Sequence, residues 1–318
     1  MNAGVESSGT PSLVSILIVN WNTRELVLKC IDSLPARVAG ATREVIVVDN
    51  GSVDGSGEAL ERRGKITLLR NAGNLGFAAA VNQAYRASTG DLVLLLNSDV
   101  ELTSQALDAL ADFLVRNPTA AAAAPIYVNP DGSPQPFHFR LPTFTMTLAN
   151  GSALVRRLLP GSARLLRDYR MLDDDFSQPR VVPQPSASCL LLRRSSLPDD
   201  HIFDERYPIF FNDVELARSF DHRGQTFWVI PDATVIHEGA ASTRMLGPTL
   251  KRQYLGSVIR MLEATEPRHK VWLYRAVVLG QHVPKWLLRR TGELSYKDLR
   301  RALTGDVGPL PQWSPIAE

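Results

Sequence analysis

The chain has 318 residues, of which 44% are hydrophobic and 21% charged, as expected for a globular protein with one large domain or two small ones. Its 35 Lys and Arg residues against 33 Asp and Glu give a net charge of +2, so no overall field argues for nucleic acid as a partner. Residues 1–12 lack the apolar core of a signal peptide, and no run of about 18 apolar residues could span a membrane, so we expect a cytoplasmic protein.

The first part of the chain alternates between apolar runs of strand length and helical patterns. The runs lie at 15–19, 44–48, 66–69, 92–96 and 120–128. Apolar residues at helical spacing lie between them: Val27, Cys30, Ile31 and Leu34, an alanine-rich stretch at 76–88, and Leu107, Leu110, Ala111 and Leu114. Asn22 and Glu25 have the spacing of a capping box before the first helix. This alternation predicts parallel strands with crossover helices, a sheet that binds ligands outside the carboxyl ends of its strands.

The second part of the chain is less regular. Residues 137–185 suggest short helices and loops, and we interpret the acidic run 173–175 as a solvated loop. Strand patterns return at 188–194 and 225–237. The two cysteines, Cys30 and Cys189, lie in apolar surroundings without a CxxC motif, so buried free thiols are expected rather than a disulfide or a zinc site.

Residues 248–290 are helical in pattern and basic, with nine Lys and Arg against two Glu. Trp272, Tyr274, Trp286 and Leu287 are interleaved with these charges. Two interpretations stay open: amphipathic helices that pack on the domain, or a basic and aromatic surface that rests on an anionic membrane. We expect a tail at 291–318 and a disordered N-terminus at 1–11.

Polar side chains gather where the predicted parallel strands end. They are Asn20 and Asn22, Asp49, Arg70 and Asn71, and Asn97, Ser98 and Asp99. The chain has no G-x-G-x-x-G after its first strand, no P-loop, and no glycine-rich basic loop of the kind that a sugar nucleotidyltransferase would carry. Mg²⁺ or Mn²⁺ fits the cluster, because such an ion needs only one or two carboxylates when substrate phosphates complete its shell. The alternative is that Asn97 and Asp99 only cap the next helix.

Four stretches together resemble family 2 glycosyltransferases of the GT-A fold, most closely the rhamnosyltransferase-like group. They are VSILIVNWNTRE (14–25), VIVVDNGSVDGS (45–56), RNAGNLGFAAAVNQA (70–84) with LVLLLNSDV (92–100), and FDERYPIFFNDVELARSFDHRGQTFWVIPDATVIHEGAAS (203–242). The resemblance implies an α/β, Rossmann-like GT-A domain at 12–247, with a mostly parallel sheet flanked by helices and a C-terminal helical extension at 248–290.

The resemblance also assigns roles to residues at the donor side. The implied nucleotide-sugar contacts are Asn20, Asn22, Asp49, Ser52, Asn74, Gly76, Asn97 and Ser98. Gly76 permits close backbone approach, and the helix that follows favours a phosphate at its N-terminus. Residues 97–99 occupy the position of the family's D-x-D motif, with Asn97 in place of the first Asp, so Asp99 is the implied metal ligand and Ser98 a spacer.

On the acceptor side, Asp213 aligns with the catalytic base of the family, and Asn212 takes a place often held by an acid. In an inverting transfer, such a base removes the proton of the acceptor hydroxyl as its oxygen attacks the anomeric carbon. His237 is implied as a second metal ligand or a diphosphate contact. We place Phe77 and Trp228 in the core, and Arg244 could pair with phosphate.

The implied activity is inverting transfer of a sugar from a nucleoside-diphosphate donor to a hydroxyl of a glycan or lipid-linked glycan, as in bacterial cell-wall polysaccharide synthesis. The donor could be dTDP-rhamnose or a UDP-sugar, and the cofactor Mn²⁺ or Mg²⁺. The enzyme could also be peripheral at the inner face of the plasma membrane. Two other interpretations are a sugar-1-phosphate nucleotidyltransferase and a non-catalytic sugar-nucleotide binder, which Asn97 and Asn212 favour.

Overall fold

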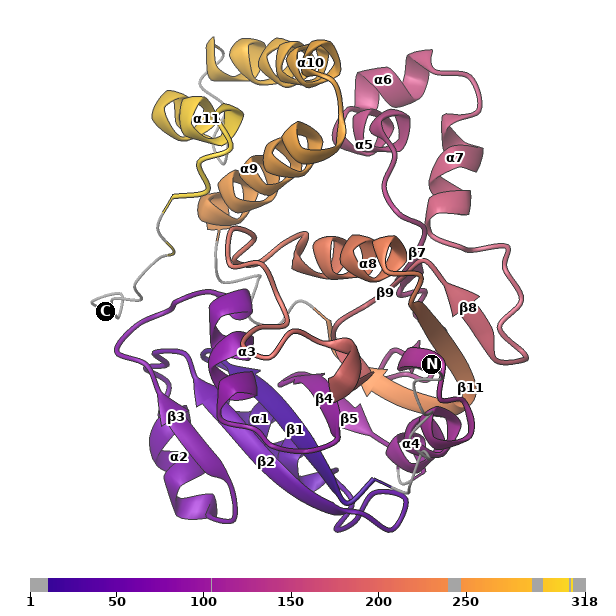
Figure 1. Ribbon diagram of the computed structural model, residues 1–318. Coiled ribbons are helices and arrows are strands. Elements are labelled where there is room, and N and C mark those ends of the chain that lie inside the picture. The colour runs from indigo at the N-terminus through magenta and orange to yellow at the C-terminus, as the bar shows by residue number, and fades with distance from the viewer. Residues whose placement is uncertain (1–10, 104, 240–246, 288–293, 309, 311–318) are drawn as a thin grey trace, which may run out of the picture.

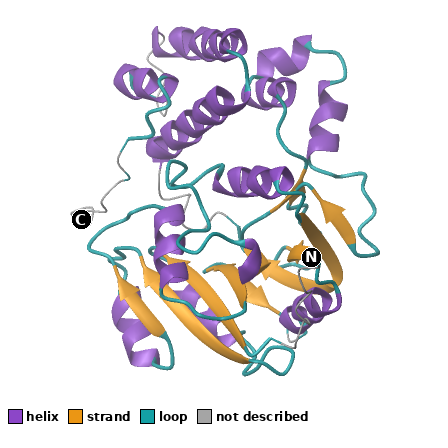
Figure 2. Cartoon of the chain, in the orientation of Figure 1, coloured by secondary structure: helices purple, strands orange, loops and turns teal. Residues whose placement is uncertain are grey.

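The computed structural model describes residues 11–103, 105–239, 247–287, 294–308 and 310 of the chain. It consists of an α/β part, built on one large sheet, and a helical cap that stands over one side of it (Figure 1). Figure 2 shows the same division, with the strands confined to the lower part of the view and only helices at its top.

The main sheet has nine strands in the order β3-β2-β1-β4-β10-β6-β11-β5, with β8 paired to β11. Their bounds are β1 (Leu13–Asn20), β2 (Thr42–Asp49), β3 (Thr67–Arg70), β4 (Leu92–Asn97), β5 (Val100–Leu102), β6 (Ala120–Val128), β8 (Arg180–Val182), β10 (Cys189–Arg193) and β11 (Thr226–His237). Strands β3, β2, β1 and β4 are parallel neighbours, and β6 is parallel to β11. The later strand β10 lies antiparallel between β4 and β6, so the sheet is mixed, although the four strands that deliver the polar residues of the N-terminal half are parallel.

Helices cover both faces of this sheet. They are α1 (Arg24–Asp32), α2 (Ser56–Arg63), α3 (Phe77–Arg86), α4 (Ala106–Arg116) and α8 (Asn212–His222). Successive residues of a strand point to opposite faces, so β4 sends Leu94 into the core shared with α1, α2 and α4, and Leu95 into the core shared with α3 and α8. This double burial explains why the strands read as continuous apolar runs.

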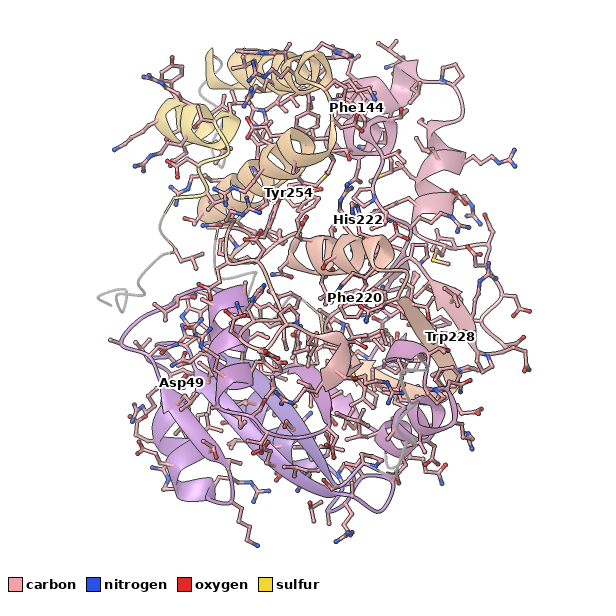
Figure 3. The ribbon with its side chains drawn as sticks, in the orientation of Figure 1. Asp49, Phe144, Phe220, His222, Trp228 and Tyr254 are labelled. Carbon is pink, nitrogen blue, oxygen red and sulfur yellow. The ribbon has the colours of Figure 1, made fainter. Side chains whose placement is uncertain are left out.

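The cap combines two separate segments of the chain. Its helices are α5 (Phe144–Gly151), α6 (Ala153–Leu158), α7 (Ser162–Tyr169), α9 (Gly247–Thr265), α10 (Arg268–Leu287) and α11 (Tyr296–Leu303). A third hydrophobic cluster joins Ile259 of α9, Tyr274 of α10 and Leu299 of α11, with Phe144 of α5 packed against it. Figure 3 places Phe144 and Tyr254 in the cap and Asp49 in the sheet below.

The structure corrects several expectations about single segments. The region 291–318 is more than a tail, because α11 lies within it and buries Leu299 against α9. Tyr274 lies on the buried side of α10 rather than on a surface. The side chains of Trp286 and Leu287, like Arg244, fall outside the described residues. None of the helices described here is long and apolar enough to cross a membrane.

Two local interactions also differ from the expected ones. The capping box is wrong: Thr23 is the N-cap of α1 and makes no side-chain cap bond, while Asn22 Oδ1 accepts from the Val53 amide at 2.8 Å. The acidic run is an ion-pair cluster rather than a simple solvated loop, since Asp174 pairs with both Arg140 and Arg180. Cys30 and Cys189 are buried free thiols, as expected.

Candidate active site

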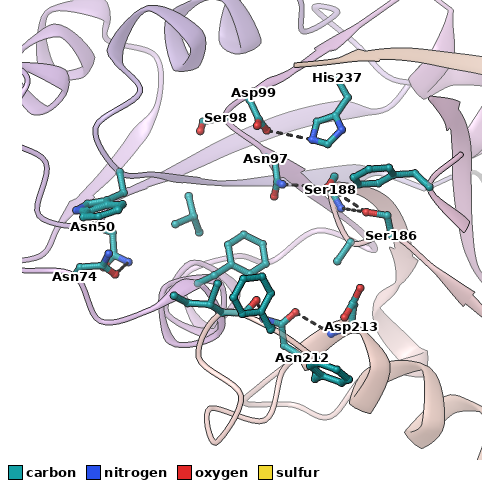
Figure 4. Close-up of a pocket in the computed structure, with 18 of the residues that line it drawn as sticks. Asn50, Asn74, Asn97, Ser98, Asp99, Ser186, Ser188, Asn212, Asp213 and His237 are labelled. Atoms are coloured by element: carbon teal, nitrogen blue, oxygen red, sulfur yellow. Dashed lines mark hydrogen bonds and ion pairs between the residues drawn. The ribbon is translucent and has the colours of Figure 1, made fainter. Parts of the chain in front are cut away.

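A cavity of about 510 Å³ opens at the carboxyl ends of the central strands (Figure 4). Besides the strand ends, its walls come from the start of α3, the short antiparallel pair of β7 (His138–Phe139) and β9 (Gln184–Pro185), the segment 186–188, and the loop before α8. The lining residues are Val19, Trp21, Asn50, Asn74, Phe77, Asn97, Ser98, Asp99, Phe137, Phe139, Ser186, Ala187, Ser188, Ile209, Phe210, Phe211, Asn212, Asp213 and His237.

Four predicted donor-side residues form a hydrogen-bond network beside this cavity rather than its lining. They are Asn20, Asn22, Asp49 and Ser52. Asn20 Nδ2 donates to Asp49 Oδ1 at 3.2 Å and to Ser52 Oγ at 3.1 Å. Thr23 Oγ1 donates to Asn20 Oδ1 at 2.8 Å and lies 2.9 Å from Ser98 Oγ. The network therefore ties the ends of β1 and β2 to the segment that follows β4.

Asn50, which the sequence analysis did not select, organises the neighbouring loop. Its Nδ2 donates to Asn74 Oδ1 at 3.0 Å, and its Oδ1 accepts from the Asn71 amide group at 3.0 Å and from the Leu75 backbone at 3.1 Å. Gly76 does not line the cavity. Its φ of +95° and the 2.9 Å between an ideal Cβ there and Pro208 Cβ show that its close approach is to the loop before α8.

Asp99 and His237 meet although 138 positions separate them in the sequence. Strand β5 pairs antiparallel with β11, with His237 opposite Val100, and this register brings the histidine beside the carboxylate. The distance from His237 Nε2 to Asp99 Oδ1 is 3.5 Å, and both residues are buried. Phe137 packs edge-on against the imidazole, with ring centroids 4.8 Å apart.

Hydrogen bonds on its far side fix the orientation of the His237 ring and the role of its Nδ1 atom. Gln135 Nε2 lies 3.2 Å from the His237 backbone oxygen and 2.8 Å from Asn129 Oδ1. Because a backbone oxygen can only accept, that atom must be the amide nitrogen, and Gln135 Oε1 then faces His237 Nδ1 at 2.8 Å. His237 Nδ1 must donate this bond, so Nε2 is the ring nitrogen that faces Asp99.

Asn97 contributes a neutral oxygen to the same wall. Its Nδ2 donates to Ser188 Oγ at 3.1 Å, and Ser188 Oγ in turn accepts from Ser186 Oγ at 3.1 Å. Asn97 Oδ1 is buried and has no hydrogen-bond partner in the part of the chain that the structure describes. An unpaired buried acceptor is costly, so this oxygen is suited to a ligand hydroxyl or a cation.

These oxygen and nitrogen atoms fit a divalent ion that is only partly held by protein. Within the described ranges, no group of three or more His, Cys, Asp or Glu side chains could hold a metal ion. Asp99 and His237 supply two potential ligands, with Asn97 Oδ1 beside them. Mn²⁺ and Mg²⁺ commonly bind in this way when phosphate oxygens and waters fill the remaining positions.

Asp213 faces the cavity from the opposite side (Figure 4). It lies in the first turn of α8, where its Oδ1 accepts from the Val214 amide at 2.9 Å and its Oδ2 accepts from Gln184 Nε2 at 3.2 Å. Burial raises the pKa of this carboxyl, and the two hydrogen bonds oppose that rise. Asn212 donates to the Ile209 backbone oxygen at 3.0 Å, a bond that an ionised acid at this position could not make.

Aromatic side chains form much of the cavity wall near Asp213. Phe137 and Phe139 come from the β7 region, and Phe210 and Phe211 precede α8. Tyr254 of the cap packs against Phe210 and Phe211, with ring centroids 5.5 and 5.6 Å apart. The sequence does not predict this wall, because its one local signal is the FF pair before Asn212.

Two aromatic residues can be compared with their predicted places in the core. Phe77 lines the cavity and also packs against Phe203, with ring centroids 5.8 Å apart, so its expected place in the core is only part of its role. Trp228 packs against Phe113 at 5.3 Å between ring centroids, as expected for a residue of the core.

Comparisons with known proteins show which family this chain resembles. Residues 15–199 match the model of the family described as Glycosyl transferase family 2. N-acetylglucosaminyl-diphospho-decaprenol L-rhamnosyltransferase of Mycobacterium tuberculosis is 33% identical over 214 residues, which are 63% of this chain and 67% of that protein. O-antigen biosynthesis protein RfbC of Myxococcus xanthus is 26% identical over 247 residues, 74% of this chain and 18% of that protein.

Two solved structures share the fold at low sequence identity. The mannosyltransferase PcManGT from Pyrobaculum calidifontis, in complex with GDP-Man and Mn²⁺, is 18% identical with a TM-score of 0.50 over 93% of this chain and 80% of that one. GalNAc-T7 with UDP, GalNAc and Mn²⁺ is 16% identical with a TM-score of 0.52 over 71% and 43%. The expected GT-A fold is thereby confirmed.

Proposed function

Because the chain belongs to glycosyl transferase family 2 and its rhamnosyltransferase-like group, we propose that it is an inverting, metal-dependent sugar transferase. The observation that carries this proposal is the placement of two opposed functional groups in one cavity. Asp99 and His237 lie on one wall, and Asp213 lies across from them. An inverting transfer needs this arrangement, because the hydroxyl attacks one face of the anomeric carbon while the diphosphate leaves from the opposite face.

We propose dTDP-rhamnose as the donor and a lipid-linked glycan as the acceptor. The support is the rhamnosyltransferase named for N-acetylglucosaminyl-diphospho-decaprenol, which is 33% identical over 63% of the chain. The nucleotide would extend from the cavity toward the network of Asn20, Asp49 and Ser52, whose acceptor oxygens suit a ribose or a base N–H. Asn50 and Asn74 would border the nucleotide in the cavity, and Asn97 Oδ1 would accept from a hydroxyl of the ligand.

Asp99 and His237, with Asn97 beside them, would hold Mn²⁺ or Mg²⁺. When bound, such an ion neutralises the charge that develops on the departing diphosphate. Gln135 holds the ring of His237 so that Nε2 faces this site. Asn97 in place of a carboxylate leaves the site with one formal negative charge from residues 97–99, so the donor diphosphate would supply much of the remaining attraction.

Asp213 would accept the proton of the acceptor hydroxyl while the new C–O bond forms and the C–O bond to the diphosphate breaks. Its raised pKa makes it a stronger base than an exposed aspartate. Gln184 holds one carboxylate oxygen and the Val214 amide holds the other, so the carboxylate is fixed at the cavity wall. The phenylalanine wall formed by Phe137, Phe139, Phe210 and Phe211 would pack against the acceptor sugar and exclude water from the reacting centre.

A transfer assay tests this function directly. Purified protein is incubated with Mn²⁺, a synthetic polyprenyl diphosphate carrying N-acetylglucosamine, and either dTDP-rhamnose, UDP-glucose or UDP-galactofuranose. The expected result is a disaccharide product from dTDP-rhamnose with an inverted anomeric centre. A parallel reaction with sugar 1-phosphate and nucleoside triphosphate should release no pyrophosphate; release there, without disaccharide, would identify a nucleotidyltransferase instead. Binding of nucleotide sugar without either product would identify a non-catalytic binder.

A further inference from the structure

Helix α10 carries an apolar stripe that the fold leaves uncovered. One side of the helix buries Val271, Tyr274 and Val278, at positions i, i+3 and i+7. The other side carries Trp272, Leu273 and Leu279, which are 65%, 51% and 39% exposed. A helix that serves only to cover a core is expected to be polar on its outer side, so this second apolar side needs a separate explanation.

Helix α6 adds two further exposed apolar residues at the same end of the molecule (Figure 1). Leu154 and Leu158, one helical turn apart, are 61% and 71% exposed, and the exposed Arg156 and Arg157 lie between them. The neighbouring helix α5 packs on α10, where Gly151 lies against the Tyr274 hydroxyl. We name Trp272, Leu273 and Leu279 together with Leu154 and Leu158 the end face.

The α10 residues of the end face lie in the most basic part of the chain. Residues 247–305 contain 12 Lys and Arg against 4 Asp and Glu, a net charge of +8. The remainder of the chain then has 23 Lys and Arg against 29 Asp and Glu, a net charge of −6. A chain that is nearly neutral as a whole is therefore strongly polarised, with its positive charge in the segments that form the cap.

We propose that the end face binds an anionic lipid bilayer. Exposed Trp and Leu side chains enter the interfacial region of a bilayer, and surrounding cations are attracted to anionic headgroups. A second copy of this chain fits less well, because two surfaces of the same positive sign would face one another. Arg268, exposed at the start of α10, lies beside the stripe and adds to its cationic border.

The cap also connects the end face to the active-site cavity. Tyr254 of α9 packs on Phe210 and Phe211 of the cavity wall, and Ile259 of α9 shares a hydrophobic cluster with Tyr274 of α10. A docked cap would hold the cavity at a constant position relative to the bilayer. The inference rests on the proposed function only for this purpose, delivery of a lipid-linked acceptor, since binding itself needs neither donor nor acceptor.

Vesicle flotation tests the end face with the whole protein. Phosphatidylcholine vesicles with about one third phosphatidylglycerol should carry the wild-type protein upward, and pure phosphatidylcholine vesicles or high salt should carry much less. Trp272→Glu and Leu273→Glu together should lower the partition coefficient on anionic vesicles about tenfold or more. Val181→Glu, a matched change at an exposed apolar residue of β8, should leave binding at the wild-type level.

Circular dichroism and thermal unfolding should show that the double variant is folded, since both side chains are exposed. The proposal is wrong if wild-type protein mixed with anionic vesicles stays at the bottom of the gradient. It is equally wrong if the double variant and Val181→Glu float to the same extent. It is also wrong if light scattering shows a dimer that the double variant converts to a monomer without vesicle binding. Sugar transfer to a water-soluble acceptor is measured in parallel. Failure of transfer would contradict the proposed enzymatic function, whereas failure of vesicle binding would contradict only the proposed docking of the end face.

Discussion

At the scale of single residues, Asp213 is the group on which the proposed chemistry most directly depends. Replacement Asp213→Asn keeps the size and the contact with Gln184 but removes the base, so kcat should fall by about 10²- to 10⁴-fold. Nucleotide affinity, measured by calorimetry, should stay near the wild-type value. Glu215→Gln changes the other acidic residue in the first turn of α8. It is the matched control and should retain activity. Equal activities of the two variants would remove Asp213 from the mechanism.

The raised pKa of Asp213 also predicts a pH effect on stability. The folded protein holds this proton more tightly than the unfolded chain does. The free energy of unfolding therefore falls as pH rises through the raised folded pKa of the carboxyl. Asp213→Asn should therefore have a higher free energy of unfolding than wild type at neutral pH, and the gain should shrink toward acid pH. Urea titrations at several pH values measure this difference, and a gain that grows in acid would contradict the assigned direction.

Gln135 is expected to act on metal binding through His237 rather than by contact with the ion. Gln135→Leu removes the acceptor for His237 Nδ1, so both imidazole tautomers become available. Affinity for Mn²⁺ in the presence of a nucleoside diphosphate should fall about 10- to 100-fold, as measured by electron paramagnetic resonance of free Mn²⁺. Gln135→Glu keeps an acceptor and should retain more affinity than Gln135→Leu; the reverse order would exclude this positioning role.

At the scale of elements, the contact between Gly76 and Pro208 joins the start of α3 to the loop that carries the phenylalanine wall. Gly76 has φ +95° and ψ 159°, a region that residues with a Cβ rarely occupy. Gly76→Ala should destabilise the protein by about 1–3 kcal/mol, because a Cβ would meet Pro208. It should also weaken nucleotide-sugar binding, since the loop after Pro208 lines the cavity.

Gly132→Ala is the control for this glycine effect. Gly132 also has a positive φ, +79°, but no atom lies within 4 Å of its ideal Cβ position. It should cost about 1 kcal/mol from backbone strain alone and leave ligand binding unchanged. Thermal unfolding and calorimetry on both variants separate strain from contact, and identical effects on binding would show that the Pro208 contact is irrelevant to the site.

The short pair of β7 and β9 contains a buried histidine that makes stability sensitive to acid. Burial lowers the pKa of His138 to about 4, while its Nε2–H donates to the Pro125 oxygen at 3.0 Å. The unfolded chain takes up this proton near pH 6.5 and the folded chain does not, so stability is lost as pH falls from about 6.5 to about 4. At pH 4 this loss is on the order of 3 kcal/mol, and His138→Gln should reduce it.

His222→Gln provides the comparison, because it makes the same replacement at a histidine that is exposed and lies at the end of α8 (Figure 3). Chemical denaturation between pH 4 and pH 7 distinguishes the two variants. A wild-type slope in His138→Gln would show that other groups cause the acid sensitivity.

At the scale of the whole molecule, parallel strand ends were the predictable part of the site. Asp49 ends β2 and Asp99 follows β4. The alternating pattern implies that these strands are parallel, so the position of both residues at one edge of the sheet could be inferred. Gln135 and Gln184 could not be inferred, because they reach the site through loops and the β7–β9 pair, where no periodicity marks a partner. The split cap could not be inferred either, since α5 and α9 lie far apart in the sequence and meet through packing and through one bond from Asn150 Nδ2 to the Tyr254 hydroxyl at 3.2 Å.

The whole protein is expected to couple the binding of the metal ion to the binding of the nucleotide. Two protein ligands, Asp99 and His237, would hold an ion weakly, but donor phosphates could complete its shell. Mn²⁺ alone should therefore raise Tm little, dTDP alone modestly, and the two together by more than the sum of the separate shifts. Asp99→Ala should abolish the excess shift, whereas Glu101→Ala, which removes a nearby carboxylate paired with Lys29, should keep it. Additive shifts in the wild type would mean that ion and nucleotide bind independently, and the ion would then have to lie away from the diphosphate.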